Sequence, residues 1–156
     1  MNDVDLTNTY EKLMKVIADV NLNSNVEKIL EQFNSKVIHK QYGFGGELLH
    51  RGYYCPSKIF DIVVGNVSRG KITKKMPVGR DPSFTFGFDS QNRLILVEQP
   101  GLSEIIYYKE QSEIGIAISD DMTIQSLSEC HFLGEKIDSY QGYYDYIWRK
   151  VNYLQR

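Results

Sequence analysis

Two cysteines and three histidines are the side chains best suited to nucleophilic chemistry (Cys55, Cys130, His39, His50 and His131). A cysteine nucleophile needs a histidine within hydrogen-bond reach to activate it. Cys130 and His131 are adjacent, so on a strand they would point to opposite faces. Pairs of Cys55 with His131, or of Cys130 with His39 or His50, stay open, because only folding can bring them together. Without a recognisable pair, we expect buried cysteines, surface histidines and no enzyme activity.

Motifs that hold metals or phosphates are missing from the sequence. There is no CxxC, HxH or HExxH spacing, and Asp120–Asp121 lack the ligand pattern of a calcium loop. Gly43–Gly46 are rich in glycine, but a phosphate-binding loop should open a helix, whereas the residues that follow read as extended. The sequence therefore predicts a hairpin turn at these glycines, no metal and no cofactor.

Charge is sorted along the chain, although the formal net charge is only −2. Lys36–Pro82 contain nine basic and three acidic residues, whereas Glu98–Asp145 contain ten acidic and two basic residues. An excess of one sign attracts a partner of the opposite sign and speeds association. The acidic block is also rich in tyrosine, a common anchor at protein interfaces. The acidic block therefore predicts a binding surface for a cationic protein. The alternative is that these acids only keep the protein soluble.

Residues 1–35 have the pattern of two amphipathic helices. Apolar residues recur at spacings of three and four in the first of them, at Leu6, Tyr10, Leu13, Met14, Ile17 and Val20. Ser24 and Glu27 form a capping-box signature that begins a shorter second helix. Its apolar face consists of Val26, Ile29, Leu30 and Phe33. Both helices must bury these faces against another layer of structure.

An antiparallel meander is predicted for residues 83–146. Ser83–Gln99 read as a hairpin with a polar turn at Asp89–Arg93, and Glu104–Ser119 read as a second hairpin. In the second hairpin, the alternation places the isoleucines from Ile114 to Ile118 on one face and small residues on the other. Strands at Thr123–Leu133 and Ile137–Tyr146 continue the meander.

The remaining segments are less regular. Residues 36–82 read as irregular or β structure, in which Val37–Tyr42 and Glu47–Tyr54 could pair. The tail, residues 147–156, fits a helix or a last strand, and its aromatic content favours the strand. No linker or repeat divides the chain. We therefore expect one α+β domain over residues 1–156, with two N-terminal helices packed on an antiparallel β-meander sheet.

Three segments between Phe84 and Tyr146 resemble, in general character, the immunity proteins of bacterial polymorphic-toxin and contact-dependent inhibition systems: FTFGFDSQNRLILVEQ, IIYYKEQSEIGIAIS and SYQGYYDY. This resemblance implies a module that binds a cognate toxin domain, commonly a nuclease, and covers its basic surface. The implied contact residues are acids and aromatics: Glu98, Glu104, Glu110, Glu113, Asp120, Asp121, Glu129, Glu135, Asp138, Tyr143, Tyr144 and Trp148.

The beginning of the chain contains no basic leader followed by an apolar run, and no stretch approaches the ~18 apolar residues of a membrane span. We expect a cytoplasmic bacterial protein with reduced cysteines, no membrane association, and a monomeric or weakly dimeric free state.

Two other functions fit parts of the sequence. A small enzyme or ligand-binding domain would use the polar cluster Glu47, His50, Arg51, Tyr53, Tyr54 and Cys55 beside the glycines. Nucleic-acid binding would use the basic segment Arg69–Lys75, with Tyr42, Phe44, Tyr53 and Tyr54 as stacking faces. The isoelectric point of about 5.9 argues against a general affinity for nucleic acid.

Overall fold

The computed structural model describes residues 11, 15, 26–46, 50–56, 68–79, 83–134, 136–144 and 149–154, the last two ranges by their backbone alone. Nine strands form one antiparallel sheet in the order β2-β1-β3-β4-β5-β6-β7-β8-β9. Their bounds are β1 His39–Phe44, β2 Lys71–Thr73, β3 Ser83–Phe88, β4 Leu94–Gln99, β5 Leu102–Tyr108, β6 Ser112–Ser119, β7 Ile124–Leu133, β8 Lys136–Tyr144 and β9 Arg149–Leu154. From β3 onward each strand pairs with the next, so the predicted antiparallel meander is confirmed.

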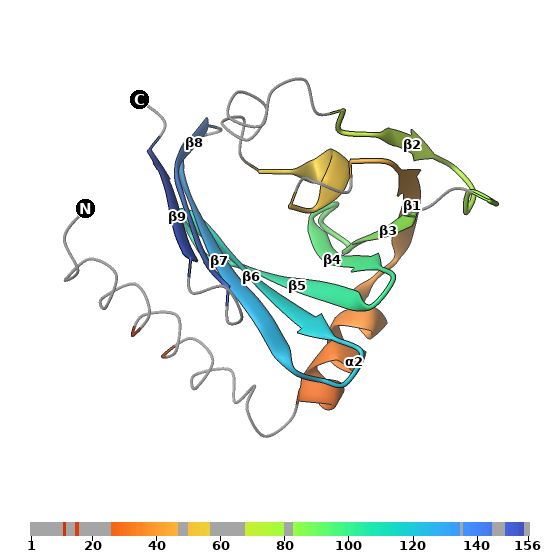
Figure 1. Cartoon of the computed structure of the whole chain (residues 1–156), viewed down its shortest axis with the longest axis horizontal. Helices are drawn as coiled ribbons and strands as arrows, with labels where there is room; N and C mark the ends of the chain where they lie inside the picture. Colours follow the sequence, from red (N-terminus) through yellow and green to blue (C-terminus); the bar gives the residue numbers. More distant parts are fainter. Residues whose placement is uncertain are drawn as a thin grey trace.

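The sheet is strongly curved, and its two faces carry different layers (Figure 1). Helix α2, Val26–Lys36, packs on the outer face through Ile29 and Phe33. These two side chains join a cluster that includes Ile105 and Ile116, which are paired across β5 and β6. Burying an isoleucine or phenylalanine contributes about 1.5–3 kcal/mol. The helix is therefore held by the apolar stripe that its sequence predicted.

The inner face is covered by residues 50–56, which contain a short 3₁₀ helix, η2, at Gly52–Tyr54 (Figure 1). This segment packs on the aromatic side chains of β3. The rings of Tyr54 and Phe86 meet edge to face, with centroids 4.8 Å apart. A Cβ atom on Gly52 would lie 3.0 Å from the ring of Phe84, so a residue without a side chain is needed at this approach.

Three expectations about the first half and the tail have different outcomes. Of the first predicted helix, the structure describes only Glu11 and Lys15, both helical, so that helix stays a prediction. The suggested hairpin of Val37–Tyr42 with Glu47–Tyr54 is wrong, because β1 pairs with β2 and β3 instead. Tail residues Arg149–Leu154 form β9, as their aromatic content favoured.

Within the described ranges, the structure contains no helix with the length and apolar character of a membrane span.

Candidate functional site

A buried arginine lies against the inner face of the sheet. Arg51 is 4% exposed and reaches two acids on neighbouring strands. Its Nε atom donates a hydrogen bond of 2.6 Å to Oε2 of Glu104 on β5, and its Nη1 atom donates one of 2.5 Å to Oε1 of Glu113 on β6. Both carboxylates are themselves buried. The arginine therefore joins the 50–56 segment to two central strands through charged hydrogen bonds.

The backbone at Arg51 has an unusual conformation. Its φ angle is 63°, in the left-handed region that residues with a side chain rarely adopt. Gly52 follows with φ 54°. Two successive residues of this kind reverse the chain at the start of η2. The two ion pairs compensate the local backbone cost at Arg51.

Gly115 on β6 provides the space that Arg51 occupies. A Cβ atom there would lie 2.5 Å from Nη2 of Arg51 and 2.7 Å from Oγ of Ser128. Ser128 is the partner of Gly115 in the register of β6 and β7. The small residues on this face of the second hairpin thus leave room for a large side chain from another part of the chain.

His50 completes the cluster, hereafter the Arg51 cluster: His50, Arg51, Glu104 and Glu113. Nε2 of His50 contacts both carboxylate oxygens of Glu104, one of them at 3.0 Å. The side chain of His50 is 15% exposed and that of Arg51 is 3% exposed. His50 is therefore the member of the cluster nearest to solvent.

The charges of the cluster stabilise one another. Burial alone would raise the pKa of Glu104, but the charges of Arg51 and His50 outweigh it and lower that pKa from 4.5 to about 2. Burial alone would lower the pKa of Arg51, but the carboxylates of Glu104 and Glu113 raise it well above its ordinary value. Glu104 and Arg51 are consequently both ionised at neutral pH.

A histidine oriented by a carboxylate is one half of a catalytic dyad, and the other half is an accessible nucleophile. Cys130 pairs with Glu113 in the sheet and has no exposed surface. Its burial raises the pKa of the thiol, which favours the unreactive protonated form. Ser128 is also buried. The Arg51 cluster therefore anchors the 50–56 segment, and among the described residues it presents no nucleophile to solvent.

The acids predicted as partner contacts lie in different parts of the fold and differ in burial. Glu104, Glu113 and Glu129 are buried, so they are not part of an exposed acidic face. Glu98 lies near the β4–β5 turn, and Asp120 and Asp121 form the β6–β7 turn. Glu110 lies in the β5–β6 turn at the opposite end of the sheet. Strand β8 contains Asp138, Tyr143 and Tyr144, whereas Glu135 and Trp148 are outside the described residues.

Arg51 was a candidate only as one of the six residues from Glu47 to Cys55, and Glu47 lies outside the described residues. Its partners, Glu104 and Glu113, are among the acids that the sequence predicts at an exposed surface. The sequence did contain a signal for their burial, because Glu104 and Glu113 each belong to a strand whose other residues are mostly apolar or small. Gly115 and Ala117 were a second signal, since small residues on one face of a strand leave room for a larger side chain.

Among the described residues, no group of three or more histidines, cysteines and acids is placed to hold a metal ion. In comparisons with protein-family models, curated proteins and solved structures, nothing matches this chain.

Proposed function

We propose that this chain is a protein-binding module of the immunity-protein type, which neutralises a cognate toxin domain by covering its basic surface. The contact surface is one end of the meander, where the β4–β5 and β6–β7 turns lie side by side. We call it the acidic end and define it by Glu98, Asp120, Asp121 and Met122. This surface is smaller than the acidic face expected from the sequence.

The observation that carries this proposal is the register of the strands. Leu102, the first residue of β5, pairs with Ser119, the last residue of β6. The β4–β5 turn is therefore next to Asp120 and Asp121, which are exposed. Met122, at the tip of the same turn, is 37% exposed. Acids around an exposed apolar side chain on a rigid hairpin fit a cationic protein surface with an apolar anchor point.

The end of β8 reaches the same region. Tyr144 pairs with Ser126, two residues beyond the start of β7, and with Arg149 at the start of β9. Of the aromatic residues expected at the interface, Tyr143 and Tyr144 thus lie on strand positions close to the acidic end. The buried Arg51 cluster lies on the inner face and joins β5 and β6, the two strands flanked by the β4–β5 and β6–β7 turns.

Co-expression with the product of the neighbouring gene tests the proposal. A toxin domain encoded there should co-purify with this chain, and its toxicity should be suppressed. The double change Asp120→Lys, Asp121→Lys should weaken binding at least tenfold, because it places positive charge against a positive partner.

Glu110→Lys is the matched control, since it changes charge on an exposed turn at the opposite end of the sheet. It should leave the affinity within about twofold. Equal losses from the two variants would show that only total charge matters, and failure to capture the neighbouring product would contradict the proposed function itself.

A further inference from the structure

A second surface lies on the outer face of β1, β2 and β3. Tyr42 pairs with Thr73 and Thr85, and Phe44 pairs with Lys71 and Ser83. Directly paired residues of an antiparallel sheet share one face, and their Cβ atoms are about 5 Å apart. Lys40 lies two residues before Tyr42 and so shares that face. The outer β1 face is defined by Lys40, Tyr42, Phe44, Lys71, Thr73, Ser83 and Thr85.

Helix α2 covers a different part of the same side of the sheet. Its cluster contains Leu96, Ile105, Ile116 and further residues of the meander, but none of the outer β1 face. At the boundary, a Cβ atom on Gly87, the partner of Lys40, would lie 2.7 Å from Val37. Tyr42 and Phe44 remain half-buried at the surface. The cover provided by the helix therefore stops near Gly87.

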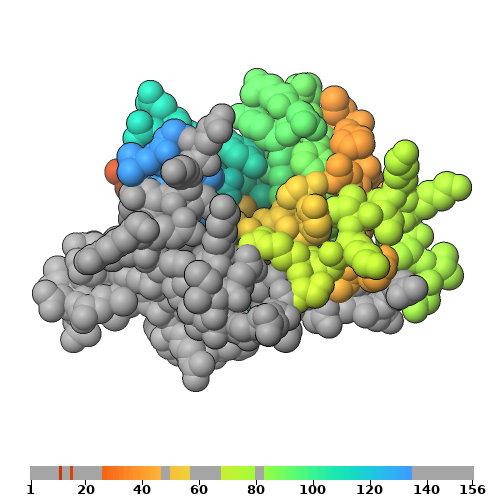
Figure 2. Space-filling model, turned by 90° about the horizontal axis from the view of Figure 1, so that it is seen from above, coloured from red at the N-terminus to blue at the C-terminus, as the bar shows by residue number. Residues whose placement is uncertain are grey.

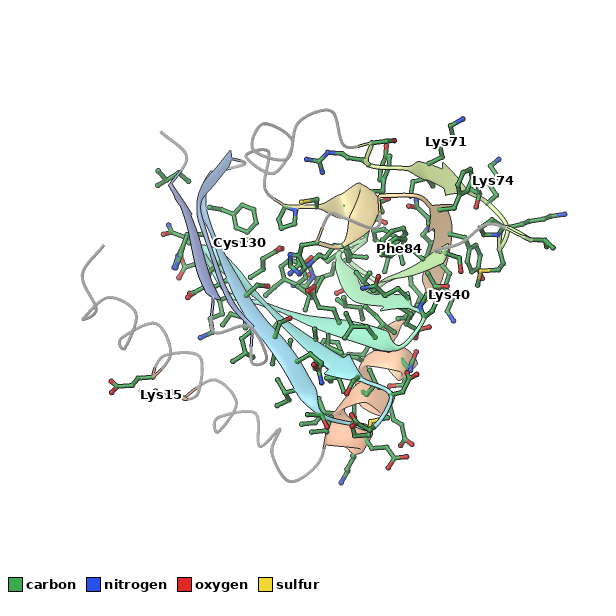
Figure 3. The ribbon with its side chains drawn as sticks, viewed as in Figure 1. Lys15, Lys40, Lys71, Lys74, Phe84 and Cys130 are labelled. Atoms are coloured by element: carbon green, nitrogen blue, oxygen red, sulfur yellow. The ribbon has the colours of Figure 1, made fainter. Side chains whose placement is uncertain are left out.

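The charge on this face is positive. Lys40 and Lys71 of this face are exposed, and so is Lys74, which directly follows β2; all three point away from the interior of the molecule (Figure 3). Part of residues 68–79 projects from the body of the protein in the space-filling view (Figure 2). Among the described residues, Glu98, the partner of Thr85, is the acid nearest to the face in the register, and it is half-buried.

Arg69 is directed elsewhere, although it adjoins these lysines in the sequence. Its Nη1 atom donates a hydrogen bond of 2.8 Å to the carbonyl oxygen of Cys55, in the segment that covers the inner face. In the described part of the chain, the basic surface thus consists of lysines. Lysines are mobile point charges that suit a phosphate backbone without requiring one fixed geometry.

We propose that the outer β1 face binds single-stranded nucleic acid. Two half-buried aromatic side chains of β1 lie among lysines and hydroxyl groups from β1, β2 and β3 on one face, and bases stack on aromatic rings while lysines contact phosphates. An acidic protein segment would use the lysines but has no need of Tyr42 and Phe44 beside them. This inference does not depend on the proposed immunity function, because it uses the opposite charge and other residues, although Glu98 of the acidic end is the direct partner of Thr85 on this face.

Fluorescence anisotropy with labelled oligothymidine and oligouridine of about 16 nucleotides tests this inference. If Lys40, Lys71 and Lys74 contact phosphates, a plot of the logarithm of the affinity against the logarithm of the salt concentration should have a slope of about −2. The affinity should then fall about 20-fold between about 50 and 200 mM salt. Lys40→Glu with Lys71→Glu should reduce affinity at least tenfold. Tyr42→Leu, which keeps an apolar side chain but removes the ring, should reduce it by about fivefold or more.

Lys109→Glu is the control, because Lys109 is an exposed lysine in the β5–β6 turn, away from this face. Its affinity should stay within about twofold of the unchanged protein, and circular dichroism should show each variant to be folded. Absence of binding at about 50 mM salt would overturn the inference. So would an equal loss from Lys109→Glu, or preferential binding of a polyglutamate peptide, which would assign the lysines to an acidic protein.

Discussion

Nε of Arg51 donates a hydrogen bond of 2.6 Å to Oε2 of Glu104, 53 residues further along the chain. This contact closes the 50–56 segment onto the middle of the meander, and a second bond from the same guanidinium reaches Glu113. A buried charge that loses its partner is far more costly than the pair is favourable. Four predictions test how the inner face is held together.

Arg51→Met should strongly destabilise the protein, because it leaves the carboxylates of Glu104 and Glu113 buried without the guanidinium. The expected loss in the free energy of unfolding is about 3–5 kcal/mol, measured by urea denaturation. Arg93→Met is the matched control: Arg93 pairs with Asp89 at 2.8 Å, but its side chain is 44% exposed. That change should cost about 1 kcal/mol or less. Similar losses from both variants would show that burial of Arg51 does not decide the effect.

Acid should weaken the fold through Glu104. Its pKa is lowered from 4.5 to about 2 in the folded state, so its contribution to stability is complete above pH 4.5 and is lost as the pH falls through 2. A shift of this size corresponds to about 3 kcal/mol. Urea midpoints measured across this pH range should fall steeply for the unchanged protein and less steeply for Glu104→Gln. Parallel curves for the two proteins would assign the acid sensitivity to other carboxyl groups.

Gly115→Ala should disturb the Arg51 cluster by overpacking. The new Cβ atom would meet Nη2 of Arg51 at 2.5 Å and Oγ of Ser128 at 2.7 Å, so at least one side chain must move. Overpacking of this kind costs about 1–3 kcal/mol, which a thermal melt would detect as a lower Tm. Adding Ser128→Gly removes one of the opposing atoms and should recover part of the loss. No recovery would place the clash on Arg51 alone.

Both thiols should be unreactive in the folded protein. Cys55 is 7% exposed and Cys130 is fully buried, and burial raises the pKa of the Cys130 thiol. Only a thiolate attacks a disulfide reagent at an appreciable rate. Ellman's reagent should therefore react with both cysteines in urea and with neither under native conditions. Prompt native reaction of the Cys55→Ser variant would contradict the burial of Cys130.

The local pattern of the sequence was sufficient for most of the meander. Turn residues at Asp89–Arg93 and the alternation of Phe84, Phe86 and Phe88 predicted β3 and β4 where the structure has them. Glycines before an apparently extended run are typical of a hairpin turn, so the pattern around Gly43–Gly46 predicts the wrong partner for β1. Residues 50–56 instead form a turn and η2, and β1 finds its partners in β2 and β3.

Amino-acid sequence by itself determined the strands of the meander from β3 to β8, their turns and the two-sided alternation, because these depend on neighbours within a few residues. It also determined the sorting of charge along the chain. Only the tertiary structure decided which charges are available. Glu104, Glu113 and Glu129 belong to the same acidic block as Asp120 and Asp121, yet the first three are buried and the last two are exposed. For Glu104 and Glu113 the difference arises because the sheet brings Arg51 against them from 53 and 62 residues away, and no local pattern encodes contacts at that separation.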